Sequence, residues 1–103
     1  MQIGQPSLTA RRAAAHRAQH QRLEEGRIFA DPLAETVLGD TPEAVFGEAG
    51  DTPRQRGMRL LIAARSRIAE DALAAAVARG VAQYVVLGAG LDTFACRNPH
   101  AGL

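Results

Sequence analysis

The feature that most constrains the fold is a junction where a long amphipathic segment passes into a short apolar run and then into glycines. Residues 53–79 place apolar side chains at helical spacing, which predicts one long helix. Residues 82–87, AQYVVL, are an almost continuous apolar run, typical of a strand buried on both faces of a parallel sheet. Gly88-Ala89-Gly90 follow directly. This order predicts an α/β fold in which a helix, the first strand and a glycine-rich turn succeed one another.

The residues before this unit predict a helical segment. Ser7 or Thr9 can cap a helix that ends at Gly26. The stretches DPLAETVLG and TPEAVFG each place a capping residue before a proline, which favours two further short helices. The glycines that follow TPEAVF weaken the second of these helices, and GDTP is a turn pattern.

A chain of 103 residues allows one domain, which we divide into a helical lid (residues 1–52) and a unit of long helix, first strand and glycine-rich turn (residues 53–103). Twelve basic and eleven acidic residues nearly cancel, so no nucleic-acid-binding surface is expected. No window reaches the ~18 apolar residues of a membrane span, and the start lacks the apolar core of a signal peptide. One cysteine excludes an internal disulfide. These features favour a soluble cytoplasmic protein.

The glycine turn raises the question of its ligand. In open α/β folds ligands bind where such a turn follows a strand, because a Cβ there would block their approach. A dinucleotide-binding turn requires a third glycine, and this chain has Thr93 at that position. Asp92 would repel a phosphate. The chain also has no lysine, which a phosphate-binding loop requires. A nucleoside without phosphates, such as S-adenosylmethionine, fits better. An NAD- or nucleotide-binding Rossmann segment and a tight turn without ligand stay open as alternatives.

Four motifs carry a family resemblance. VVLGAGLDTFACR resembles the first cofactor-binding motif of the leucine carboxyl methyltransferase-like family, whose bacterial members typically read LGAGLDTRAYR. SLTARRAAAHRAQHQ is similar to the family's N-terminal segment, FADPLA to its Asp-Pro-Leu-Ala element, and AARSRIAEDAL to its Arg-x-Arg helix. The resemblance covers roughly residues 7–98, with the motifs in the family's order.

The resemblance implies the N-terminal part of a Rossmann-like (class I) methyltransferase fold. It also implies S-adenosyl-L-methionine as methyl donor and transfer to a carboxylate or hydroxyl of an unidentified small-molecule acceptor. No catalytic residue is identified, and no acid or base is strictly required for a carboxylate acceptor. The residues that we expect to bind the cofactor are Arg65, Gly88, Ala89, Gly90 and Asp92.

This chain departs from the family pattern at two places. Phe94 and Cys96 stand where the family has Arg and Tyr in LDTRAYR. Some eukaryotic carboxyl methyltransferases also place a lysine near the cofactor carboxylate, where a loose alignment gives Ala10 here. Whether Arg11, Arg12 or Arg17 takes over that role stays open.

The predicted position of Arg65 indicates that this residue binds a ligand. On a helical wheel it lies roughly 20° from Met58, within an apolar stripe that we expect to be buried. A buried guanidinium needs an anion. The resemblance implies that this anion is the carboxylate of the cofactor's methionyl end; an internal partner such as Asp92, or a side chain that reaches solvent, is the alternative. Arg67, on the opposite side, is expected to be a solvated surface charge.

Two other chemical groupings are set aside. His16, His20 and Glu24 are spaced four apart and could share a helix face. No H-E-x-x-H motif or cysteine pair supports a metal site, so we expect a polar helix face there and no metal. Cys96 has no readable histidine partner, so a small buried thiol is expected rather than a nucleophile.

The last expectation concerns the length of the chain. In such folds an acidic residue that grips the ribose lies roughly 20 positions after the glycine turn, which would place it beyond Leu103. We therefore expect these 103 residues to bind the cofactor weakly and to be inactive alone, and to self-associate through unpaired strand edges. A non-catalytic gene fragment with only packing or association roles is the competing interpretation.

Overall fold

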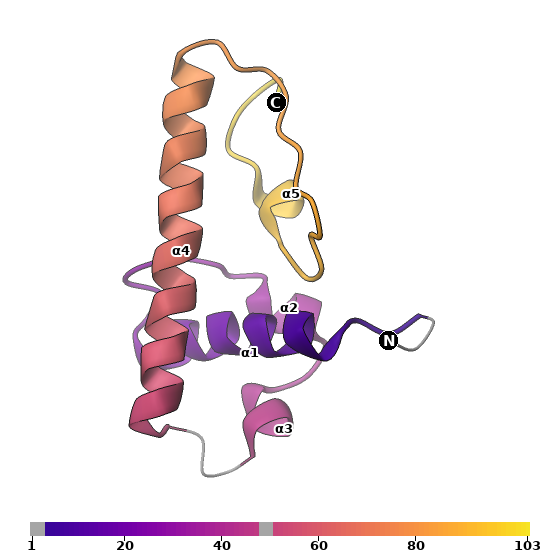
Figure 1. Cartoon of the computed structure of the whole chain (residues 1–103), viewed down its shortest axis with the longest axis vertical. Helices are drawn as coiled ribbons and strands as arrows, with labels where there is room; N and C mark the ends of the chain where they lie inside the picture. Colours follow the sequence, from indigo (N-terminus) through magenta and orange to yellow (C-terminus); the bar gives the residue numbers. More distant parts are fainter. Residues whose placement is uncertain (1–3, 48–50) are drawn as a thin grey trace.

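The computed structural model describes residues 4–47 and 51–103, which contain helices and, within those ranges, no β-strand (Figure 1). The helices are α1 (Leu8–Leu23), α2 (Ala34–Leu38), α3 (Pro42–Phe46), α4 (Pro53–Ala78) and α5 (Phe94–Arg97).

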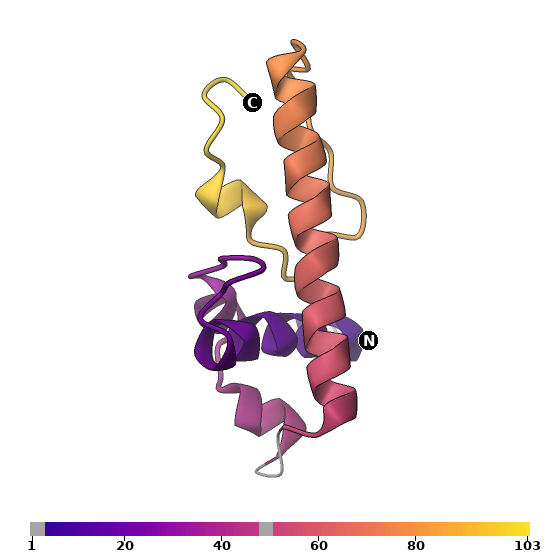
Figure 2. The same cartoon turned by 90° about the vertical axis from the view of Figure 1, so that its left-hand side faces the viewer.

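The long helix α4 is the axis on which the other elements are arranged. Helix α1 crosses its N-terminal half, α2 and α3 pack on α1, and residues 81–103 run back beside its C-terminal half (Figures 1 and 2). The molecule measures 46 × 34 × 18 Å. These extents are those of the Cα trace, and its shortest extent is less than half of its longest, so few side chains are covered on every side.

Hydroxyl side chains cap the starts of α1, α3 and α4, whereas the predicted start of the second helix at Asp31 and Pro32 is wrong, because α2 begins at Ala34 after Leu33 without a side-chain cap. The Ser7 hydroxyl accepts a hydrogen bond from the Ala10 N–H at 3.1 Å, so Ser7 rather than Thr9 begins α1. Thr41 caps α3 in the same way, which shows that the short helix forms despite the glycine that ends it. Thr52 and Gln55 cap each other's backbone at the start of α4. Helix α4 matches the predicted range of 53–79 within one residue.

Small side chains form the centre of the packing between α1 and the short helices. Ala14 and Ala15 are fully buried against Leu38 of α2. Because alanine projects only a methyl group, the helix backbones approach closely and little apolar area is removed from water. The partly buried residues around this centre are Val37, Val45, Phe46 and Leu91.

The buried face of α4 differs from the predicted stripe. Met58 is 45% exposed, whereas its neighbour Arg59 is fully buried together with Ala63. Successive residues are 100° apart on a helix, so the face that meets α1 is turned by about that angle from the expected one. Arg65 is therefore exposed, and the expectation that it lies in a buried stripe is wrong.

Arg59 supplies the ion pair that joins α1 to α4. Its guanidinium donates to both carboxylate oxygens of Glu24 at 2.7 and 2.8 Å and to Asp51 at 3.1 Å. These hydrogen bonds raise the pKa of Arg59, and the bond from Arg59 lowers the pKa of Glu24. The requirement that a buried arginine have an anion thus holds, but for Arg59 instead of Arg65.

His20 completes this polar joint. Its Nε2 accepts from the backbone N–H groups of Ile28 and Phe29 at 3.3 and 3.2 Å. Since Nε2 is an acceptor, the neutral ring carries its proton on Nδ1, which donates to Glu24 at 2.8 Å. Both ring nitrogens of His20 are thereby engaged in holding the loop after α1.

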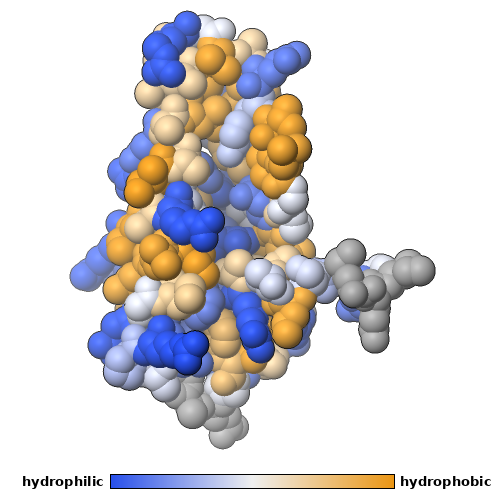
Figure 3. Space-filling view, viewed as in Figure 1, coloured by the Kyte–Doolittle hydropathy of each residue, from blue (hydrophilic) through white to orange (hydrophobic). Residues whose placement is uncertain are grey.

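The predicted strand at residues 82–87 is not formed in the described structure. The segment has no regular secondary structure and is exposed, with Val85 76% and Leu87 89% accessible, and apolar side chains lie on the surface around it (Figure 3). A strand is defined by backbone hydrogen bonds to a neighbour. Within residues 4–47 and 51–103 no second strand pairs with it, so its apolar pattern has no sheet to enter.

We predict that Arg59→Met lowers the free energy of unfolding by about 3 kcal/mol, because Glu24 would lose its bidentate partner at the α1–α4 crossing. Urea unfolding followed by circular dichroism measures the change. Arg56→Met is the matched control, since Arg56 pairs with Asp51 at the surface. Equal effects of the two substitutions would contradict a structural role for the buried ion pair.

Candidate functional site

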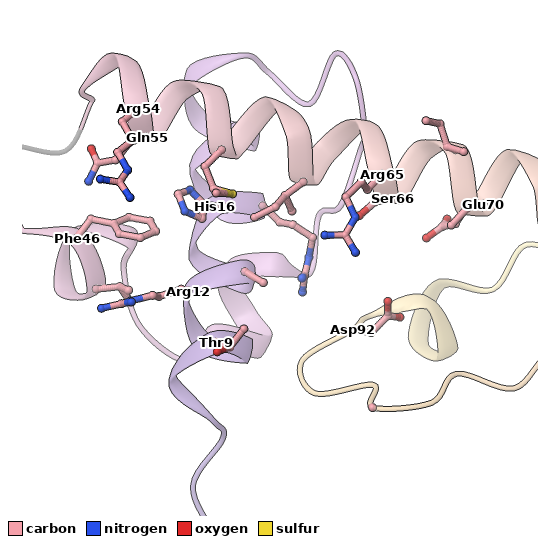
Figure 4. Close-up of a pocket in the computed structure, with 18 of the residues that line it drawn as sticks. Thr9, Arg12, His16, Phe46, Arg54, Gln55, Arg65, Ser66, Glu70 and Asp92 are labelled. Atoms are coloured by element: carbon pink, nitrogen blue, oxygen red, sulfur yellow. The ribbon is translucent and has the colours of Figure 1, made fainter. Parts of the chain in front are cut away.

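An open cavity of about 1260 Å³ lies between α1, α3, α4 and the glycine turn. Most of the side chains that line it are polar or charged, and they converge from four segments that are distant in sequence (Figure 4). The lining residues include Arg12, His16, Phe46, Arg54, Arg65 and Asp92.

The two glycines of the turn need to be glycine for different reasons. Both have left-handed backbone conformations, with φ of 60° at Gly88 and 53° at Gly90. A Cβ on Gly88 would meet nothing within 4 Å, and Gly88 lines the cavity. A Cβ on Gly90 would lie 3.0 Å from the Cβ of Ala10 on α1. Gly88 therefore leaves space at the cavity wall, whereas Gly90 lets the turn dock on α1.

Arg65 points from α4 across the cavity toward the side where Asp92 lies (Figure 4). It forms no ion pair with a residue of the described ranges. Asp92 instead accepts the Phe94 N–H at 2.8 Å and so caps the start of α5. Within the described chain, the alternative in which Arg65 pairs internally with Asp92 is therefore not realised, and a guanidinium and a carboxylate both line the same cavity.

The five predicted cofactor residues are brought together only in part. Arg65, Gly88 and Asp92 line the main cavity. Gly90 packs on α1, and Ala89 lines a neighbouring hollow of about 360 Å³.

A buried carboxylate that sequence reasoning missed holds the turn in place. Asp31 is 1% exposed, and its Oδ2 accepts from Arg17 Nε at 3.1 Å. Its Oδ1 accepts from the Thr93 hydroxyl at 2.8 Å. Arg17 also donates to the Leu91 carbonyl. The N-terminal motif, the Asp-Pro-Leu-Ala element and the LDT motif thus meet at one carboxylate. The only sign of this contact in the sequence was that Arg17, Asp31 and Thr93 each belong to a motif of the family resemblance.

Arg97 ties the same cluster to α4. It donates to both carboxylate oxygens of Glu70 at 3.0 and 2.7 Å and to the Thr93 hydroxyl at 2.7 Å. The hydrogen bonds to Glu70 raise the pKa of Arg97, whose guanidinium lies 5.0 Å from the centre of the Phe29 ring. The turn is consequently fixed between α1 and α4, with its inner side facing the cavity.

The two departures from the family motif have separate outcomes. Phe94 is buried and meets Tyr84 edge-to-face, with ring centroids 5.0 Å apart. An aromatic pair thus occupies the position where the family pattern has an arginine. Cys96 is exposed, so the expectation of a buried thiol is wrong. Arg67 is exposed and pairs with Asp71, in agreement with its assignment to the surface.

His16 is a second residue whose part in the cavity was not foreseen. Its side chain is buried and stacks on Phe46, with ring centroids 4.4 Å apart. Burial, together with the charges of Arg59 and Arg12, lowers the pKa of His16 and keeps it neutral. Its Nδ1 is buried with no hydrogen-bond partner among the described residues.

Comparison with known proteins gives two matches. A family model described as leucine carboxyl methyltransferase matches residues 10–102. A protein of Saccharopolyspora erythraea, provisionally named an S-adenosyl-L-methionine-dependent methyltransferase, is 34% identical over 93 residues, which make up 87% of this chain and 32% of that protein. The chain therefore spans about a third of the length of that relative. No solved structure matches the chain. Among the described residues, no helix has the length and apolar character needed to cross a membrane.

We predict that Gly90→Ala destabilises the protein more than Gly88→Ala. Both substitutions place an L-residue in the left-handed region, at about 1 kcal/mol each. Only the Gly90 variant adds a methyl group 3.0 Å from Ala10. Urea unfolding compares the variants, and equal losses of stability would show that the turn does not dock closely on α1.

We predict that His16 makes the protein less stable in weak acid. Its pKa is lowered from 6.5, so between 6.5 and the folded value the unfolded chain binds a proton that the folded chain does not. The free energy of unfolding therefore falls as the pH drops through this window. Below the pKa of His16 in the folded protein, this residue causes no further change. In His16→Phe this part of the pH dependence should vanish, as measured by urea unfolding between about pH 7.5 and pH 5. Identical pH profiles would contradict the prediction.

Proposed function

Since this chain belongs to the leucine carboxyl methyltransferase family, we propose that it forms the cofactor-binding part of an S-adenosylmethionine-dependent O-methyltransferase. The observation that carries the proposal is Arg65, a cation without an ion pair in the described chain, in the same cavity as Gly88. The family match supports the activity and the cavity supports the location. The whole enzyme's acceptor, a carboxylate or a hydroxyl, is part of the proposal.

The residues of the cavity fit the chemistry of this cofactor. Its methionyl end is a zwitterion, with a carboxylate and an ammonium group. Arg65 offers a planar donor pair for the carboxylate, and the side chain of Asp92, which also lines the cavity, offers an acceptor for the ammonium. The open position at Gly88 lets a flat nucleoside approach the backbone. Phosphate groups would meet Asp92, which disfavours a dinucleotide.

When bound, S-adenosylmethionine supplies a methyl group that is activated by its positive sulfur. What remains for the protein is to bind, to orient and to exclude water. Arg65 and Asp92 would fix the two ends of the amino-acid moiety, and the ion cluster of Asp31, Arg17 and Arg97 would hold the turn that carries Gly88. For a carboxylate acceptor no proton has to be removed by the protein.

We predict that S-adenosylhomocysteine binds the 103-residue chain weakly, with a dissociation constant near millimolar, and that Arg65→Met weakens this at least tenfold. A factor of ten corresponds to about 1.4 kcal/mol, a modest part of a charge-assisted hydrogen-bond pair. Changes of amide chemical shifts at Gly88 and Gly90 during NMR titration report the binding.

Arg79→Met is the matched control, because Arg79 is the C-cap residue of the same helix, forms no ion pair in the described chain and does not line the cavity. An equal loss of binding in the two variants would indicate non-specific attraction by positive charge. Stronger binding of NAD than of S-adenosylhomocysteine would overturn the proposed function in favour of a dinucleotide-binding segment.

A further inference from the structure

The cavity extends well beyond the part assigned to the cofactor. Arg65, Gly88 and Asp92 define one end. The other end lies where α1, α3 and the start of α4 meet, and the side chains labelled there in Figure 4 include Arg12, His16, Phe46 and Arg54. We refer to these four residues as the His16 subsite. The proposed function gives none of them a role.

His16 is the first reason to regard this end as a binding site. Only 7% of the residue is exposed, yet its buried Nδ1 has no hydrogen-bond partner in the described chain. Buried polar atoms in proteins are generally satisfied, and each exception needs an explanation. The ring is neutral, so it offers one donor and one acceptor to a molecule that enters the cavity.

The charges of the subsite are the second, independent reason. Arg12 and Arg54 line the cavity, and neither forms an ion pair with a carboxylate of the described ranges. Most other arginines of the chain do pair, for example Arg17 with Asp31 and Arg97 with Glu70. Two unneutralised guanidinium groups on facing elements, close to the positive end of the 26-residue helix α4, favour an anion between them.

The walls of the subsite restrict which anion fits. The Phe46 ring, stacked on His16, forms one side, and Val45, Met58 and Ile62 add further apolar lining. A fully hydrated inorganic anion would leave these surfaces unused. An organic anion with an apolar body of about the size of one aromatic ring would cover them.

We propose that the His16 subsite binds a small organic anion whose charged group lies between Arg12 and Arg54, whose apolar body packs on Phe46, and whose remaining hydrogen bond is made with His16. We assign this anion as the methyl acceptor, because it would share one cavity with the cofactor. This assignment rests on the proposed function. Binding of the anion itself does not require the cofactor.

The test is an NMR titration of the 103-residue chain with benzoate, and with benzamide as a neutral molecule of the same shape. We expect benzoate to bind with a millimolar dissociation constant, as few atoms allow, and to shift amides of α1 near Arg12 and His16. Benzamide should bind at least tenfold more weakly. The double variant Arg12→Met/Arg54→Met, which changes two exposed side chains, should lose at least tenfold in benzoate affinity, whereas Arg79→Met should not.

The outcomes separate this inference from the proposed function. If S-adenosylhomocysteine binds and benzoate does not, the His16 subsite is wrong and the cofactor site stands. If benzoate binds normally to Arg65→Met while S-adenosylhomocysteine fails to bind any variant, the subsite stands and the cofactor assignment falls. Benzoate shifts centred on Gly88, or equal affinity for benzamide, would overturn the subsite. His16→Phe, which keeps the stacking on Phe46, should reduce benzoate affinity more than benzamide affinity.

Discussion

The buried carboxylate of Asp31 is the constraint on which the candidate site depends. It lies in the loop between α1 and α2 and accepts hydrogen bonds from Arg17 and Thr93, which are far apart in sequence. A buried carboxylate is tolerated only with such partners, so the three segments must meet. Because Thr93 lies only three residues after Gly90, this meeting also fixes where Gly88 faces the cavity. The glycine turn is thus positioned by charge and hydrogen bonding more than by apolar packing.

This reliance on polar contacts follows from the composition of the chain. The residues of the core are largely alanines, and the thin shape leaves large side chains such as Val85 and Leu87 exposed. Hydrophobic burial scales with area, and alanine contributes little of it. The joint of Arg59, Glu24 and His20 and the cluster around Asp31 therefore carry much of the specificity with which the helices are arranged.

What the sequence could predict here is what depends on near neighbours. Ser7 and Thr41 act on backbone groups three residues away, so their caps could be recognised without any knowledge of the fold. A strand at residues 82–87 depends on hydrogen-bond partners from distant residues, so near neighbours in the sequence cannot establish whether it forms. The helical wheel of α4 similarly gave the spacing of its faces but not which face meets α1. The sequence identified Arg65, Gly88 and Asp92, which do line one cavity. It assigned His16 to a polar helix face and gave no sign that this residue lines the cavity.

The two arginines of α4 show how one helix can serve both the fold and the site. Arg59 and Arg65 are six residues apart, which places them about 120° from each other around the helix. The face with Arg59 meets Glu24 of α1 and Asp51, so its charge is neutralised within the protein. The face with Arg65 looks into the cavity, where no carboxylate of the described chain pairs with it. Because Arg59 fixes the rotation of α4 against α1, it also determines that the face with Arg65 is the one that lines the cavity. A substitution at Arg59 should therefore disturb ligand binding through the orientation of α4, even though Arg59 does not line the cavity.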